Sequence, residues 1–139
     1  MNPTQLRMKL LAAKEATDFI SETELIAISL KEERANLESV RVMLEFMEEN
    51  PNVDFGSPGP LVHFIETFYG RGYETELMAS ITRKPTSHTL WLLNRIINGT
   101  NQAMDRERLI KMLRKAESHP ASDMQARLQA THFLQRLSL

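Results

Sequence analysis

Cysteine is absent from this chain of 139 residues, and aromatic residues make up only 6% of it. Without cysteine, the chain forms no disulfide and offers no thiolate ligand to a metal ion. This composition excludes a disulfide-stapled scaffold and fits a reducing compartment. The fold must therefore rest on side-chain packing, for which a chain of this length is sufficient.

Long apolar runs and strand patterns are missing as well. No run of 18 apolar residues occurs, so the sequence predicts no membrane-spanning helix and no membrane partner. The opening residues Met-Asn-Pro-Thr lack the basic and apolar regions of a secretion signal, and we expect a soluble, cytoplasmic protein. No alternating β-branched run reaches five residues, which argues against a sheet.

What is present is helical periodicity along nearly the whole sequence. It predicts an all-α fold of about eight short helices in one domain, residues 1–139. The expected ranges are 4–17, 21–34, 37–49, 61–69, 73–82, 87–98, 106–118 and a last helix after Ser122. Short helices joined by tight loops favour antiparallel hairpins stacked as in HEAT repeats. A compact, irregular helical bundle is the alternative.

Capping residues and apolar patterns define the ends and the centre of this arrangement. The expected N-caps are Ser21 (in a capping box with Glu24), Asn36, Thr86, Asp105 and Ser122. Gly99 is expected just beyond the end of helix 87–98. Apolar residues surround that helix on nearly all sides, so we expect it to be enclosed by others, with Trp91 buried.

The sequence assembles no evident catalytic or metal centre. The four histidines include no pair at i and i+4 on one helix and no H-E-x-x-H motif, so we expect no metal site. The glycine-rich segment 56–59 lacks the Lys-Ser/Thr of a P-loop. We therefore expect a protein that is not an enzyme and takes no cofactor.

One enzymatic alternative stays open. An R-x4-H spacing occurs twice, in Arg83 with His88 and in Arg114 with His119, and it resembles the catalytic motif of HEPN-type ribonucleases. That family usually has a polar Asn or Asp after the arginine, whereas lysine follows both arginines here.

Charge is unevenly distributed along the chain. Residues 1–69 hold 6 basic and 12 acidic residues, a net charge of −6, whereas residues 70–139 hold 11 and 6, a net charge of +5. Such a split suggests two faces that meet different surroundings. Chance variation of charge on solvated helices is the alternative. The basic residues of helix 106–118 have no aromatic side chains between them, and we do not expect nucleic acid to be the partner.

The acidic residues offer a candidate binding surface for another protein. Helix 37–49 and the loop after it carry Glu38, Glu45, Glu48, Glu49 and Asp54. Acids near a helix C-terminus oppose the helix dipole, so a partner is one reason for their presence, and a merely solvated acidic face is the alternative. Aromatic rings at helix ends or in loops can be exposed, and the candidate anchors are Phe55, Tyr69 and Tyr73.

Two segments also carry a family resemblance. NVDFGSPGPLVHF (residues 52–64) and RKPTSHTLWLLNRIING (residues 83–99) resemble segments of small helical immunity proteins from bacterial polymorphic-toxin and contact-dependent growth inhibition systems. The resemblance implies a protein without a cofactor that binds the C-terminal domain of a cognate secreted toxin and blocks its active site. We expect that toxin to be a nuclease and the free protein to be monomeric. A generic helical-repeat adaptor is the alternative function.

Overall fold

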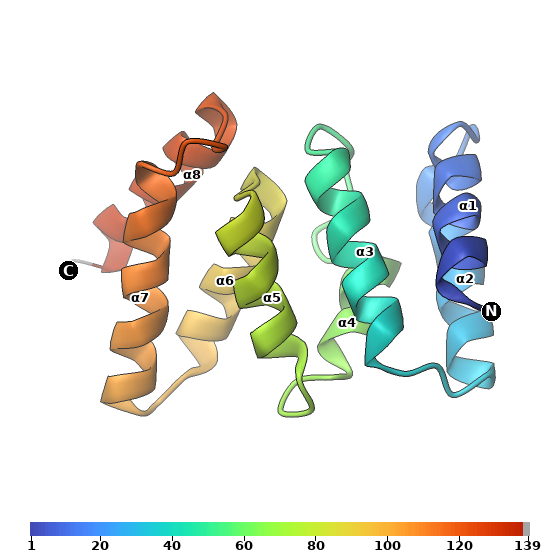
Figure 1. The fold of residues 1–139 in the computed structure, drawn as a ribbon, viewed down its shortest axis with the longest axis horizontal. Coiled ribbons are helices and arrows are strands. Elements are labelled where there is room, and N and C mark those ends of the chain that lie inside the picture. The colour runs from blue at the N-terminus through green and yellow to red at the C-terminus, as the bar shows by residue number, and fades with distance from the viewer. Residues whose placement is uncertain (138–139) are drawn as a thin grey trace. The chain divides into compact units, whose positions relative to one another are not determined.

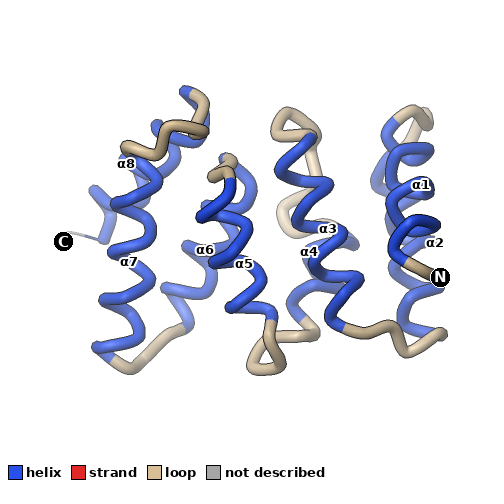
Figure 2. The backbone as a smooth tube through the Cα atoms, viewed as in Figure 1, coloured by secondary structure: helices blue, strands red, loops and turns tan. Residues whose placement is uncertain are grey.

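A computed structural model describes residues 1–137, which form eight α-helices and no strand (Figures 1 and 2). The helices are α1 (Pro3–Lys14), α2 (Phe19–Glu32), α3 (Leu37–Glu49), α4 (Pro60–Glu66), α5 (Tyr73–Arg83), α6 (Ser87–Gly99), α7 (Ala103–Glu117) and α8 (Met124–Leu137). Well over half of the described residues are helical. The predicted all-α class is therefore confirmed.

Contacts within the chain divide it into two compact units, Met1–Glu76 and Leu77–Leu139. We call them unit 1 and unit 2 and describe each by itself. The boundary falls inside α5, which contributes its first residues to unit 1 and the rest to unit 2. The expectation of a single domain stays a prediction.

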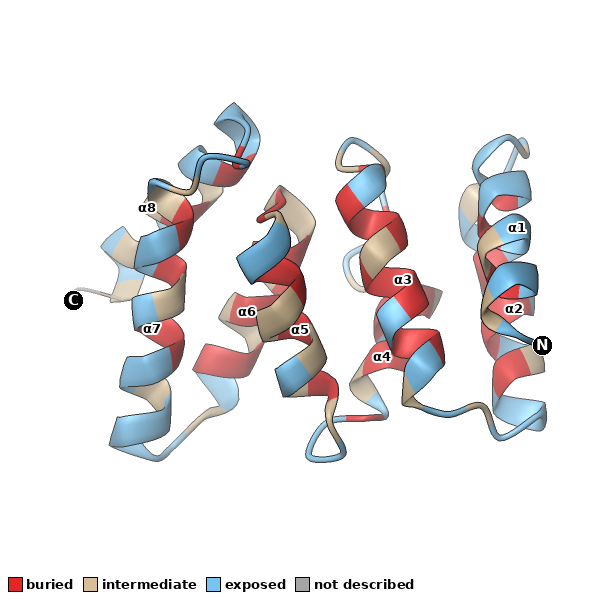
Figure 3. Cartoon of the chain, viewed as in Figure 1, coloured by how far each residue is buried: buried red, intermediate tan, exposed pale blue. Residues whose placement is uncertain are grey.

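Unit 1 is built from two stacked helical hairpins. Helices α1 and α2 form the first hairpin, and α3 and α4 form the second, with α1 against α3 and α2 against α4 (Figure 1). Buried and exposed residues alternate along these amphipathic helices, as Figure 3 shows. Within this unit the arrangement matches the HEAT-like stacking that the short helices predict.

A cluster of three phenylalanine rings lies inside unit 1. The ring of Phe46 stacks on that of Phe19 with 6.4 Å between centroids, and Phe55 meets both rings edge-on at 6.0 and 5.8 Å. Edge-to-face and offset arrangements at such distances are favourable beyond the area they bury. The cluster thereby ties the start of α2, the C-terminal part of α3 and the α3–α4 loop together.

In unit 2, α6, α7 and α8 pack against one another. Five apolar side chains of α6 are buried: Leu90, Leu92, Leu93, Ile96 and Ile97. Trp91 is only half-buried, so its expected full burial is wrong. Its ring contacts neighbours one turn away on the same helix, with His88 at 5.5 Å and the Arg95 guanidinium at 5.1 Å. One sector of α6 therefore remains at the surface.

Two of the expected N-caps are confirmed. The Asn36 side chain accepts a hydrogen bond from the backbone N–H of Glu38 at 3.0 Å and starts α3. Thr86 starts α6 in a reciprocal capping box with Thr89, with both bonds at 3.1 Å. These caps satisfy N–H groups that a helix start otherwise leaves without an acceptor.

The other expected helix ends are corrected. Asp18, and not Ser21, caps α2, because its carboxylate accepts the Ser21 N–H three residues into the helix. Gln102 lies at the N-cap of α7, so Asp105 lies three residues further on, in the first turn of the helix. Gly99 is the last residue of α6 rather than the residue after it.

The start of α8 is also corrected. Ser122 is buried, and its hydroxyl donates to the Ala116 carbonyl oxygen at 2.9 Å instead of capping the helix. Asp123 accepts from the Ala126 N–H at 2.8 Å. The Asp123 carboxylate accepts the free N–H of the first helical turn, whereas the Ser122 hydroxyl is already bonded to the end of α7.

Candidate partner-binding surface

Helix α3 carries four of the candidate acids on or near one side. Glu38, Glu45 and Glu49 are seven and four residues apart, spacings that bring side chains onto one side of a helix. Glu38 and Glu49 are exposed, and the side chain of Glu45 is 34% exposed. Glu48 is only 9% exposed, so the expectation that this acid lies on the exposed surface is wrong.

Ion pairs reduce the free charge on this side of α3. Arg7 of α1 donates to Glu45 at 3.1 Å, and Arg41 donates to both carboxylate oxygens of Glu76 at 2.9 and 3.1 Å. The hydrogen bonds from Arg41 to Glu76, followed by the charge of that carboxylate, raise the pKa of Arg41. The exposed acids that remain on α3 are Glu38 and Glu49.

The two candidate residues in the α3–α4 loop, Asp54 and Phe55, differ in exposure. Asp54 is exposed, and its carboxylate accepts the backbone N–H of Gly56 at 2.9 Å, which fixes the turn. Phe55 is 1% exposed and belongs to the phenylalanine cluster described above. The expectation that Phe55 is an exposed anchor is wrong, because its ring fills the core of unit 1.

The two tyrosines also separate. Tyr69 is 53% exposed in the turn after α4, as an anchor requires, whereas Tyr73 is fully buried. Tyr73, Leu77 and Ile81 are four residues apart along α5 and all buried. The four-residue spacing of these side chains predicts that Tyr73 belongs to the buried side of α5. It is a better guide to burial than the position of Tyr73 at the start of the helix.

Sequence reasoning missed an apolar surface on the first hairpin. Met8 and Leu11 of α1 are 64% and 46% exposed, and Leu25 and Ile28 of α2 are 60% and 46% exposed. Each pair is three residues apart, so its members share one side of their helix. A cavity of about 260 Å³ lies between the two helices and includes Leu25 in its lining. The sequence could have indicated these exposed side chains, because they are apolar residues that lie outside the buried stripe of their helix.

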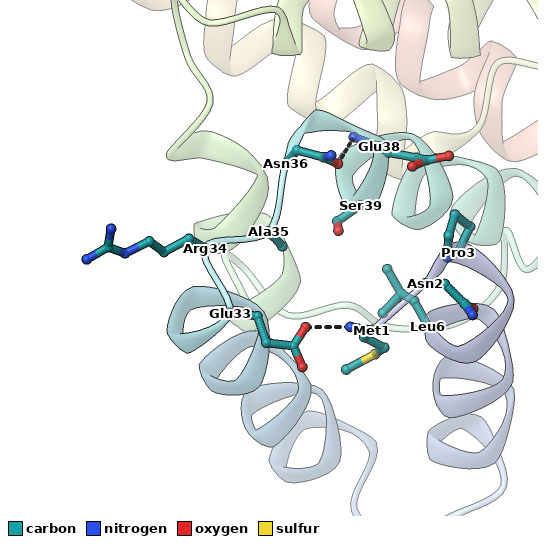
Figure 4. Close-up of a pocket in the computed structure, with 10 residues that line it drawn as sticks. All are labelled: Met1, Asn2, Pro3, Leu6, Glu33, Arg34, Ala35, Asn36, Glu38 and Ser39. Atoms are coloured by element: carbon teal, nitrogen blue, oxygen red, sulfur yellow. Dashed lines mark hydrogen bonds and ion pairs between the residues drawn. The ribbon is translucent and has the colours of Figure 1, made fainter.

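A polar pocket of about 430 Å³ lies where the start of α1 meets the α2–α3 loop (Figure 4). The Met1 amino group donates to Glu33 at 2.7 Å across it, and Glu38 and Ser39 line it from α3. Arg34 adopts a positive φ of 53° in the loop, and its side chain points away from the pocket (Figure 4). Glu33 and Glu38 both line this pocket, the first from the α2–α3 loop and the second from α3.

The histidine of the second R-x4-H motif is engaged by the backbone. His119 Nε2 lies 2.7 Å from the Thr82 carbonyl oxygen, while the Ala121 N–H donates to Nδ1 at 3.0 Å. The ring therefore donates through Nε2 and accepts through Nδ1, which holds the α7–α8 turn against the end of α5. Both nitrogens serve this structural contact.

Among residues 1–137, no group of three or more His, Asp or Glu side chains is placed to hold a metal ion. In the same part of the chain, no helix has both the length and the apolar character that a membrane span requires. No protein-family model, curated protein or solved structure matches the chain. The family resemblance of segments 52–64 and 83–99 stays a prediction.

Proposed function

We propose that this chain is an immunity protein that binds the C-terminal nuclease domain of a cognate secreted toxin and blocks its active site. The observation that carries the proposal is that the acidic and basic parts of the sequence correspond to the two compact units. Unit 1 holds 7 basic and 14 acidic residues, a net charge of −7, while unit 2 holds 10 and 4, a net charge of +6. The charge boundary thus follows the boundary between two compact units.

An acidic unit suits a nuclease partner for a physical reason. A cleft that binds phosphates is basic, and an acidic protein surface is complementary to it. Such complementarity accelerates encounter by roughly 10–10³-fold and falls with ionic strength. Exposed Glu38, Glu49 and Asp54 supply this charge from α3 and the loop after it.

Tight inhibition also needs apolar anchors within an interface of roughly 1,600 Å². The exposed large side chains of the first hairpin, together with Tyr69, take the place of the buried Phe55 and Tyr73 as anchors. They lie on unit 1, the same unit that carries the acidic charge. Unit 1 therefore combines the two kinds of surface that an inhibitor of a basic enzyme needs.

The test starts from the gene beside that of this chain, where the proposal expects a large secreted protein. The C-terminal domain of that protein is then co-expressed with this chain. We expect that domain to arrest growth when expressed alone, and we expect this chain to restore growth and to co-purify with the domain. A neighbouring gene that encodes no toxin, or a toxin domain that this chain neither binds nor neutralises, contradicts the proposal. A helical adaptor would then be the better description.

A further inference from the structure

A third pocket, of about 610 Å³, lies within unit 2 and plays no part in the proposed inhibition. Three helices build it. Trp91, Asn94 and Asn98 come from α6, three and four residues apart and hence on one side of that helix. Arg106 comes from the start of α7, and Phe133 and Arg136 come from one side of α8. Side chains from three successive helices thus line one cavity.

The charge of this pocket is positive. Arg106 and Arg136 line it, and none of the described residues that line it is acidic. Within residues 1–137, neither guanidinium forms an ion pair. Two guanidinium groups at one cavity attract an anion, and arginine binds phosphate through paired N–H donors.

The size and the lining of the pocket indicate that the anion is part of a larger organic ligand. A cavity of about 610 Å³ falls in the range of sites for small organic ligands and is far larger than a phosphate ion requires. Phe133 is 7% exposed and forms an apolar wall, while the half-buried Trp91 offers a second aromatic surface. The Asn94 and Asn98 amides add donors and acceptors suited to a heterocyclic base or a sugar hydroxyl.

We propose that this pocket binds a nucleoside monophosphate. Arg106 and Arg136 bind the phosphate, the two asparagine amides bind the nucleoside, and Trp91 and Phe133 contact its flat base. The Trp91 ring is already oriented by His88 and by the Arg95 guanidinium, which lowers the cost of ordering it around a ligand. The inference does not depend on the toxin, because every residue in it belongs to unit 2.

Trp91 is the only tryptophan in the chain, so its fluorescence reports on this pocket alone. The full-length protein is titrated with AMP, adenosine, ribose 5-phosphate and inorganic phosphate, by calorimetry and by Trp91 fluorescence. We expect saturable AMP binding with a change in Trp91 emission. Adenosine and inorganic phosphate, which each lack one half of the ligand, should bind at least about tenfold more weakly.

A matched pair of double variants tests the assignment of residues. Arg106→Gln with Arg136→Gln should weaken AMP binding at least about tenfold. Arg108→Gln with Arg127→Gln removes the same charge from exposed positions on α7 and α8 outside the pocket, and it should leave affinity within about twofold. Circular dichroism checks that both variants keep their helices.

Four outcomes overturn the proposal. No binding of AMP at millimolar concentration removes the site. Equal losses in the two double variants reduce it to general electrostatic attraction. Inorganic phosphate that binds as well as AMP leaves a bare anion site, and adenosine that binds as well as AMP removes the role of the arginines. Failure of any of these tests leaves the inhibition of a toxin untouched, because that proposal is tested on growth.

Discussion

At Gly59 the α3–α4 loop folds back so closely on itself that a side chain has no room. A Cβ atom there would overlap the carbonyl oxygen of Phe55, and the carbonyl oxygen of Gly59 accepts the His63 N–H at 3.0 Å at the start of α4. The loop that carries Asp54 and Phe55 is thereby held by backbone contacts. Gly59 is required by the close approach of two backbone segments.

We expect Gly59→Ala to lower the free energy of unfolding by about 1–3 kcal/mol, because the backbone must shift to admit the methyl group. Gly99→Ala is the control, since a Cβ there meets no atom within 4 Å. It should leave stability unchanged or raise it by up to about 1 kcal/mol, as alanine restricts the unfolded chain and favours helix. Urea unfolding of both variants measures the difference, and equal effects would contradict this reading of the loop.

Asp18 gives a prediction for the dependence of stability on pH. Its carboxylate accepts the Ser21 backbone N–H at 3.1 Å and the Ser21 hydroxyl at 2.7 Å, and these bonds, the backbone one first, hold the pKa of Asp18 below its ordinary value of 3.8. A depressed pKa in the folded state means that the cap stabilises the protein fully above the unfolded pKa. This stabilisation is lost as pH falls through the folded pKa.

Asp18→Ala should therefore unfold at a lower temperature than the parent protein near pH 7, and the two melting temperatures should converge only as pH falls below 3.8 and through the lowered pKa of Asp18 in the folded state. Asp18→Asn keeps an oxygen that can accept the Ser21 N–H but carries no charge. Its melting temperature should stay closer to that of the parent near pH 7. An alanine deficit that persists undiminished in acid would show that the carboxylate charge contributes nothing to the cap.

At the scale of elements, the phenylalanine cluster decides how the α3–α4 loop is held. Phe55 comes from a loop, yet its ring lies 6.0 Å from that of Phe46 in α3 and 5.8 Å from that of Phe19 in α2. The loop is therefore part of the core of unit 1 and positions Asp54 next to α3. This packing gives Phe55 a structural role in the place of a direct contact with a partner.

Phe55→Ala should lower the free energy of unfolding by about 3–5 kcal/mol, because it leaves a cavity among buried rings. Tyr69→Ala removes another large aromatic residue from the same unit, but one that is 53% exposed, and should change stability within about 0.5 kcal/mol. Thermal unfolding of the two variants compares them. A Phe55→Ala variant as stable as Tyr69→Ala would contradict the buried cluster.

At the scale of the whole molecule, the division of charge between the two units is the feature that bears on function. Unit 1 is acidic and unit 2 is basic, and four basic side chains of α7 are exposed: Arg108, Lys111, Arg114 and Lys115. Reversal of charge on either unit can therefore be compared with reversal on the other. Glu45 is a poor position for this comparison, because its replacement by lysine would also break the pair with Arg7.

Glu38→Lys with Glu49→Lys should leave the free energy of unfolding within about 0.5 kcal/mol for each change, since both side chains are exposed. The same double variant should slow association with the toxin domain, reduce its dependence on salt and weaken growth protection. Lys111→Glu with Arg114→Glu on α7 should preserve protection. The opposite pattern would place the partner on unit 2 and end the idea that the inhibitor imitates a phosphate substrate.

Much of the fold is readable from the sequence, because helix formation depends on local patterns. The α3 bounds and the caps Asn36 and Thr86 follow from side chains within three residues of the helix start. The same local pattern puts the candidate acids on α3, but it does not reveal that Glu48 is buried while Glu38 and Glu49 are exposed. Local patterns do not decide between two nearby residues that can each act as an N-cap. Asp18 and Ser21 both suit a helix start, and the structure shows that the Asp18 carboxylate accepts the Ser21 N–H.

The sequence by itself determined the all-α class, the order of the helices and the division of charge, since each depends on residue type and spacing along the chain. Only the tertiary structure decided which of those side chains reach the surface. It buried Phe55 and Tyr73, paired Glu45 with Arg7, and exposed Leu25 on the first hairpin. Exposure depends on which elements pack together, and that depends on contacts between residues far apart in the chain.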